Sequence, residues 1–230
     1  MRIKEAIFIL VSLAVAYDCS SQVKDGRASF QLQDFLNNRT VVLNGEWLFA
    51  WKKLLSPAEC DSTAALSAIQ VPGNWFSLNP DEAFHRRAYG YGTYVVRLHL
   101  PANQEGFALK IPNIQTAYRL YVDGELKVQR GQPGTSEDSS IPNARTAILY
   151  LPADQAAVRT LVIQTSNYHF SSSSGIWSPI ELGSFQTIID AKTRNYLVSS
   201  VLVGSLIIMG LYHIALFLCG EKTFQRSTFP

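Results

Sequence analysis

The chain has few cysteines and few charges, and it lacks the short motifs of several common enzyme classes. Three cysteines in 230 residues are too few for a disulfide framework. Charged residues make up 17% of the chain and the net charge is +2, with lysine and arginine scattered, which excludes an obvious nucleic-acid partner. The sequence contains no glycine-rich phosphate loop, no Cys/His metal-ligand spacing and no Gly-x-Ser-x-Gly elbow. We therefore predict no cofactor and no nucleotide-dependent or serine-hydrolase chemistry.

Histidines and carboxylates are also poorly placed for catalysis. The four histidines are scattered along the chain, so we predict no metal site: His85, His99, His169 and His213. Glycoside hydrolysis needs two carboxylates that face each other across a cleft. Most of the available acids fall in expected turns or strand ends, where solvation explains them: Glu46, Asp81, Glu82, Asp123, Glu125 and Glu181. We predict that the residues present do not form an enzyme.

The amino terminus has the pattern of a secretory signal. A basic start precedes the apolar run Ala6–Ala16, and small residues at its end predict cleavage after Ala16. An uncleaved anchor is the alternative. Tyr17 and Asp18 precede Cys19 where a lipoprotein signal would have small residues, so we predict no lipidation. Cys219 lies at the far end of the long apolar run near the carboxyl end, so only Cys19 and Cys60 could pair with each other. The sequence leaves open whether Cys19 and Cys60 pair.

One long hydrophobic run lies near the carboxyl end. The stretch between Arg194 and Glu221 contains no Asp, Glu, Lys or Arg. This stretch is longer than the roughly 20 apolar residues that are needed to cross a bilayer. We predict a membrane span over 196–218, with a buried core helix as the alternative. Basic residues lie on both sides of the run, so the signal segment decides the orientation: amino side out and carboxyl side in.

Between the two apolar segments the hydrophobic pattern has a period of two. In Tyr94–Leu100 the even positions are apolar, while Arg97 and His99 share the other face, as in a strand with one side on a core. Asp123-Gly124 separates two further alternating runs and predicts a hairpin. Other expected strands are Val41–Trp51, Phe107–Ile111, Thr146–Leu151, Arg159–Gln164 and Trp177–Gly183. Expected helices outside the span are short: Ala64–Ile69 and Leu32–Leu36.

These patterns predict a mainly β protein, an antiparallel sandwich or jelly roll followed by a transmembrane helix. We divide the chain into a signal peptide (1–16), an amino-terminal lead-in (17–40), the sandwich (41–183), a connector (184–195), the membrane helix (196–218) and the start of a cytoplasmic remainder (219–230). The connector is too short to act as a flexible linker, so we expect a conformational change in the sandwich to be transmitted to the helix.

Five short motifs resemble a known family when they are taken in order. They read LNGEW, VPGNW, GYGTY, SNYHF and GIWSPIELG, and they resemble the galactose-binding-like jelly roll that precedes the barrel of family 2 glycoside hydrolases. With a signal segment before them and VGSLIIMGLYHIALFL after them, the chain is more similar to the bacterial seven-transmembrane receptors with diverse intracellular signalling modules.

The resemblance implies a sensory receptor of the inner membrane, with residues 17–195 in the periplasm. Its expected partners are a small-molecule ligand, with carbohydrate as the leading class, the lipid bilayer and further transmembrane helices, and a homodimer is compatible with it. The resemblance also implies a cytoplasmic output module, which residues 219–230 do not contain. Two alternatives remain: a membrane-tethered carbohydrate-binding or adhesion module without signalling, and the amino-terminal fragment of a family 2 hydrolase.

A sugar site needs aromatic faces that stack on C–H surfaces beside polar groups that bond hydroxyls. The residues of these types that fall in or next to expected loops are Asn74, Trp75, Arg87, Tyr91, Asn167, His169 and Trp177. Each also has a structural interpretation, because a tryptophan at a strand start can fill the core and an asparagine can cap a loop. We predict that the loops carrying them form the ligand site.

Overall fold

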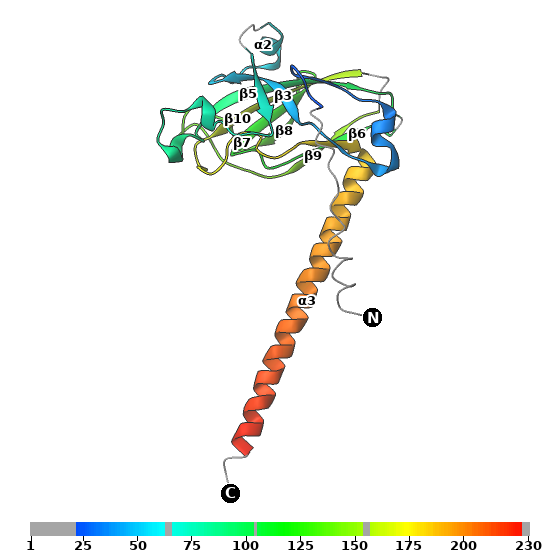
Figure 1. Ribbon diagram of the computed structural model, residues 1–230, viewed down its shortest axis with the longest axis vertical. Helices are drawn as coiled ribbons and strands as arrows, with labels where there is room; N and C mark the ends of the chain where they lie inside the picture. The colour runs from blue at the N-terminus through cyan, green and yellow to red at the C-terminus, as the bar shows by residue number, and fades with distance from the viewer. Residues whose placement is uncertain (1–21, 63–65, 104, 154–156, 227–230) are drawn as a thin grey trace, which may run out of the picture.

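The computed structural model describes residues 22–62, 66–103, 105–153 and 157–226 as a β-sandwich from which one long helix projects (Figure 1). The expected signal peptide and Cys19 lie outside the described residues, so the cleavage site and the Cys19–Cys60 pairing stay predictions. Cys60 itself is buried. The predicted mainly β architecture followed by an apolar helix is confirmed.

Two sheets form the sandwich within the described residues. The larger, sheet A, has the order β4-β3-β5-β10-β7-β8, with β1 paired to β5, and the smaller, sheet B, has the order β2-β11-β6-β9. The strands of sheet A are β1 (Arg27–Ser29), β3 (Gly45–Trp51), β4 (Ser67–Val71), β5 (Gly90–Leu100), β7 (Ala117–Val122), β8 (Glu125–Arg130) and β10 (Ala157–Asn167). Those of sheet B are β2 (Val41–Val42), β6 (Phe107–Ile111), β9 (Ala147–Leu151) and β11 (Glu181–Ser184).

Strand β5 lies in the middle of sheet A and shows the predicted alternation. Tyr94, Val96 and Leu98 are buried in the core between the sheets. Their neighbours face the opposite side of sheet A, where Val95 is covered by Cys60 of helix α2 (Pro57–Ser62). Sheet A therefore has an inner face on the core and an outer face that α2 covers in part.

The predicted hairpin is confirmed between β7 and β8. Asp123 and Gly124 have φ values of 50° and 87°, the conformation that the two central residues of a type I′ turn require. The Asp123 carboxylate also accepts hydrogen bonds from the backbone N–H of Thr160 (2.8 Å) and from Nη1 of Arg159 (2.9 Å). The turn is thereby tied to strand β10.

Residues 22–40, expected as a lead-in, contribute to the sandwich. β1 pairs in parallel with β5, and Phe30 and Phe35 are buried in the core. The expected helix at Leu32–Leu36 occurs as a 3-10 helix, η1 (Leu32–Asn38), which brings the Phe35 ring to 4.7 Å from that of Phe107. Strand β1 is too short for an alternating pattern to be recognised in the sequence.

Three sequence expectations for secondary structure differ from the fold. The helix expected at Ala64–Ile69 is wrong for its described part, because Ser67–Val71 pairs with β3 as the edge strand β4. The strand expected over Val41–Trp51 divides into β2 and β3, which belong to different sheets. The strand expected over Trp177–Gly183 begins only at Glu181, as β11. In the first two cases pairing between distant segments outweighed local propensity.

Helix α3 (Phe185–Arg226) begins at the residue after β11. The Ser184 hydroxyl accepts the backbone N–H of Thr187 at 3.1 Å, which caps the first turn. Ile188 is buried and packs over Gly183, and the Phe185 ring lies 5.0 Å from that of Tyr150 in β9. The residues expected as a connector are thus helical from Phe185, and the start of the helix is seated on the outer face of sheet B.

The rest of α3 leaves the sandwich as a single rod (Figure 1). Its segment Phe185–Phe217 is long and apolar enough to cross a membrane, and its most apolar window has none of its residues buried in the protein.

Two further short 3-10 helices, η2 (Phe76–Leu78) and η3 (Phe84–Arg86), lie in the long connection between β4 and β5.

Candidate functional site

The seven predicted site residues lie in the loops at one end of the sandwich or beside them. Gly90, at the start of β5, pairs with Asn167, at the end of β10, so the β4–β5 and β10–β11 connections meet there. The β8–β9 loop joins them, because the Ser166 hydroxyl accepts the backbone N–H of Gly134 at 3.1 Å. We call this set of connections the loop end. Their contacts divide the predicted residues into two groups.

Asn167 holds the first group together. It is fully buried, and its side-chain amide nitrogen lies within hydrogen-bond distance of the carbonyl oxygens of Ala88 (3.0 Å), Phe170 (2.7 Å) and Ser173 (3.0 Å). Its amide oxygen accepts the backbone N–H of Phe170 at 3.1 Å. The polar atoms of Asn167 therefore join two connections to each other, and Asn167 positions the loop end from within.

Trp75 holds the second group together. It is fully buried, its indole N–H donates to the Tyr94 hydroxyl at 2.7 Å, and its ring centre lies 5.2 Å from that of Trp51. Its backbone N–H donates to the Ser174 hydroxyl at 2.8 Å. The side-chain oxygen of Asn74 accepts the backbone N–H of Ser174, also at 2.8 Å. Trp75 is a core residue that fixes the loop, whereas Asn74 remains exposed.

A cluster of tyrosines is exposed in part on the outer side of the loop end. The rings of Tyr89 and Tyr168 have centres 6.4 Å apart, and the Tyr168 hydroxyl donates to the carbonyl of Thr135 at 2.7 Å. Tyr91 lies close enough for its phenol to influence that of Tyr168. The Nε of Arg87 donates to the carbonyl of Glu82 at 3.2 Å, which keeps that side chain on its own connection.

His169 and Trp177 are exposed and each uses one ring nitrogen in a bond to a neighbouring loop. Nε2 of His169 lies 3.1 Å from the carbonyl of Ser140, so Nε2 carries the hydrogen in that bond. The indole N–H of Trp177 donates to the carbonyl of Asn113 at 3.0 Å, while 42% of the residue remains exposed. Trp177 therefore presents an aromatic surface whose orientation is held by a hydrogen bond.

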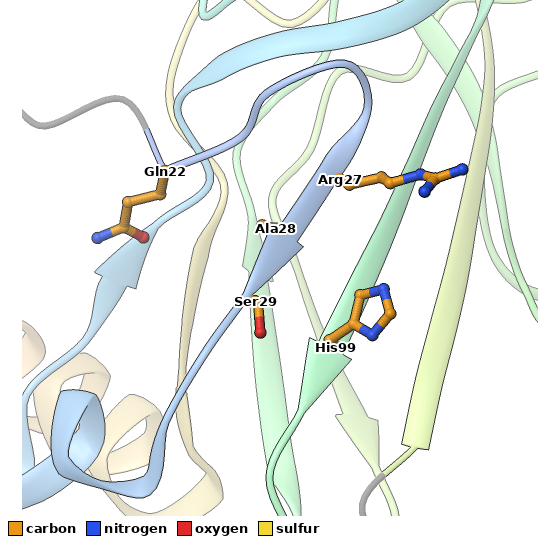
Figure 2. Close-up of a pocket in the computed structure, with 5 residues that line it drawn as sticks. All are labelled: Gln22, Arg27, Ala28, Ser29 and His99. Carbon is orange, nitrogen blue, oxygen red and sulfur yellow. The ribbon is translucent and has the colours of Figure 1, made fainter.

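The structure also has a hollow that the sequence analysis did not select. It has a volume of about 310 Å³, is open to solvent, and is lined by Gln22, Arg27, Ala28, Ser29 and His99 (Figure 2). The outward position of His99 followed from the alternation in β5, but its neighbours come from β1, which the sequence did not reveal. Among the described residues, no three His, Cys, Asp or Glu side chains are placed to hold a metal ion.

We expect the Tyr168 phenol to make the protein less stable above about pH 10. Burial, and to a lesser extent the Tyr91 phenol, raise the pKa of Tyr168 from 10.0 to about 12. The unfolded chain releases this proton at the lower pH, so the stabilisation is complete below about pH 10 and is lost as the pH rises toward about 12. The urea midpoint measured across this range should fall more steeply in the native chain than in Tyr168→Phe.

Tyr94 and Tyr118, whose pKa values are also raised by burial, remain in both proteins and serve as the common background. At neutral pH the Tyr168→Phe protein should be slightly less stable, because the bond to Thr135 is lost. Parallel pH profiles for the two proteins would show that Tyr168 does not contribute.

Comparisons with known proteins give distant structural likenesses only. No family model matches the chain, and no curated protein matches it. Among solved structures it is similar to a β-glucuronidase of Faecalibacterium prausnitzii (15% identity, TM-score 0.47, covering 63% of this chain and 31% of that one). It is also similar to a Ruminococcus gnavus β-glucuronidase in complex with D-glucuronic acid (13%, 0.47, 63% and 29%) and to a Bacteroides fragilis putative β-galactosidase (16%, 0.47, 63% and 23%). The chain spans less than a third of each of these structures.

Proposed function

We propose that this chain is a membrane-anchored, ligand-sensing module. The sandwich lies on the periplasmic side of the inner membrane, α3 crosses the bilayer, and the loop end binds a small molecule, with carbohydrate as the expected class. Residues 17–195 are then periplasmic and the residues after 218 begin a cytoplasmic remainder. The sensory role requires that the state of the loop end reach α3.

The observation that supports the membrane anchor is the exposure of α3. An apolar helix in a water-soluble protein would be packed against a core, but the apolar window of α3 has no residue buried. From Tyr196 to Phe217 the helix is about 33 Å long at 1.5 Å per residue, which matches a hydrocarbon layer of about 30 Å. A bilayer is the environment that removes this surface from water.

The start of α3 supports a rigid stalk between sandwich and bilayer. Residues 185–195 would raise the sandwich about 16 Å above the hydrocarbon layer. The Lys192 ammonium lies 5.8 Å from the ring centre of Tyr196, a basic and aromatic pair of the kind favoured at the membrane interface. Because Ile188 and Thr187 are buried against the sandwich, a shift of β11 would be carried directly into the helix.

The exposed part of the loop end supports carbohydrate as the ligand. Trp177 offers an oriented aromatic face, and Tyr91 is exposed in part; Asn74, Arg87 and His169 add amide, guanidinium and imidazole groups. Aromatic surface combined with a few polar groups is the chemistry that binds sugar rings and their hydroxyls. Trp75 and Asn167 contribute indirectly, by holding the loops that carry these side chains.

The test is ligand binding by the full chain in neutral detergent micelles. A panel of neutral mono- and oligosaccharides is screened by thermal shift, and the affinity of any binder is compared between the native chain and Trp177→Ala. Because Trp177 would stack on the ligand, we expect affinity to fall at least about tenfold. Leu126→Ala removes exposed apolar surface from the β7–β8 hairpin region instead and should leave affinity unchanged.

The outcome also separates the sensor from its alternatives. In the sensor, ligand binding alters amide hydrogen exchange in residues 185–190, whereas a module that only tethers shows protection confined to the loop end. A hydrolase fragment without a membrane role would be released from membranes by alkaline carbonate. Binding of no sugar, together with binding of another ligand class, would remove the carbohydrate proposal.

A further inference from the structure

Four side chains around the hollow form a regular block on the edge of sheet A. Arg27 is the register partner of Arg97, and Ser29 is the register partner of His99, in the parallel pairing of β1 with β5. Residues 97 and 99 alternate with the buried Val96 and Leu98, so they face away from the core. Register partners share a face, which places all four side chains on the outer face of sheet A.

The block concentrates positive charge in an open site. Figure 2 shows the Arg27 and His99 side chains extending to the same side of β1 and β5, with Ser29 beside them. Among the described residues, neither side chain makes an ion pair or a hydrogen bond, although the backbone carbonyl of His99 accepts the N–H of Phe30. The donors of the Arg27 guanidinium are thus available to a ligand.

The wall of the hollow also offers a hydroxyl. The Ser29 side chain is exposed and can donate or accept a hydrogen bond. A ligand that carries hydroxyl groups as well as an acidic group would bond Ser29 as well as Arg27.

The position of the hollow favours a soluble ligand over a lipid headgroup. It lies on the outer face of sheet A, whereas Ile188 seats α3 over Gly183 on the outer face of sheet B. The two outer faces point in opposite directions, because the sheets pack on each other through the core. A bilayer that holds α3 would therefore be on the far side of the sandwich from the hollow.

We propose that the hollow between β1 and β5 is a binding site for an oxyanion, the carboxylate, sulfate or phosphate group of a small soluble ligand. Arg27 supplies the principal charge-assisted hydrogen bonds, and His99 and Ser29 complete the cradle. The site is separate from the loop end, so it binds whether or not the loop end binds a sugar. An acidic sugar suits this cradle, because its hydroxyls also bond Ser29.

The test is isothermal titration of the full chain in neutral detergent, in a chloride buffer of low ionic strength. The probes are D-glucuronate, inorganic sulfate and inorganic phosphate, with D-glucose as the neutral counterpart of D-glucuronate. We expect saturable binding of at least one oxyanion and weaker binding of glucose. Arg27→Gln removes the charge-assisted hydrogen bonds of the guanidinium and should weaken anion binding at least about tenfold.

The control removes a positive charge far from the hollow. Lys127→Gln alters β8, at the other edge of sheet A, and should leave the affinity within about twofold of the native value. A preference for glucuronate over sulfate would identify an acidic sugar, and the reverse would identify an inorganic anion. The proposal fails if no oxyanion binds, if glucose binds as tightly as glucuronate, or if Arg27→Gln retains the native affinity. Both variants alter exposed side chains, so their folding is not in question.

Discussion

The double variant Ile207→Lys, Leu211→Lys is expected to lose its integration into the membrane. The two residues lie one turn apart near the centre of the apolar segment of α3, and both are exposed. A lysine at the centre of a transmembrane helix costs about 2.5–3.5 kcal/mol, so two cost roughly 5–7 kcal/mol. The native chain should resist alkaline carbonate extraction, and the double variant should be released by it.

The matched control places two lysines in the same helix but outside the bilayer. Thr193→Lys with Asn195→Lys adds the same charge just before Tyr196, at positions that are already exposed. This protein should remain in the membrane pellet. If the native chain is extracted as readily as the Ile207→Lys, Leu211→Lys protein, α3 does not span a membrane and the sensory proposal is lost with it.

Replacing Gly175 by alanine is expected to lower the free energy of unfolding by about 4 kcal/mol. Gly175 has a φ of 59°, and a Cβ there would lie 2.7 Å from the indole nitrogen of Trp75 and closer still to the Tyr94 hydroxyl. Those two atoms form the 2.7 Å hydrogen bond that orders the interior of the loop end. Overpacking costs about 1–3 kcal/mol and the left-handed backbone about 1–2 kcal/mol more.

Gly124→Ala separates the two contributions. Gly124 also has a positive φ, 87°, but a Cβ there would meet no atom within 4 Å. Only the backbone strain remains, and the expected loss is about 1–2 kcal/mol. Urea unfolding of both variants in detergent measures the difference. Equal losses would show that the space around Gly175 adjusts, and that the bond between Trp75 and Tyr94 does not set the geometry of the loop end.

The candidate site shows where sequence reasoning reached its limit. The motifs around Trp75 and Asn167 identified loops that come together in the fold, since both residues lie at the loop end. The sequence could not distinguish a tryptophan that faces solvent from one that fills the core. That difference depends on Ser174, almost one hundred residues further along the chain, whose hydroxyl accepts the Trp75 backbone N–H.

The sequence alone determined the local features of this protein. An unbroken apolar run predicts a helix in a nonpolar environment, alternation predicts β5 with one buried face, and Asp123-Gly124 predicts a tight hairpin, because each depends on residues close together in the chain. The tertiary structure decided which strands became neighbours. It placed β1 beside β5 and so created the hollow of Arg27 and His99, and it seated Ile188 on Gly183. Such contacts join segments whose separation along the chain leaves no periodic signal, so only the folded protein reveals them.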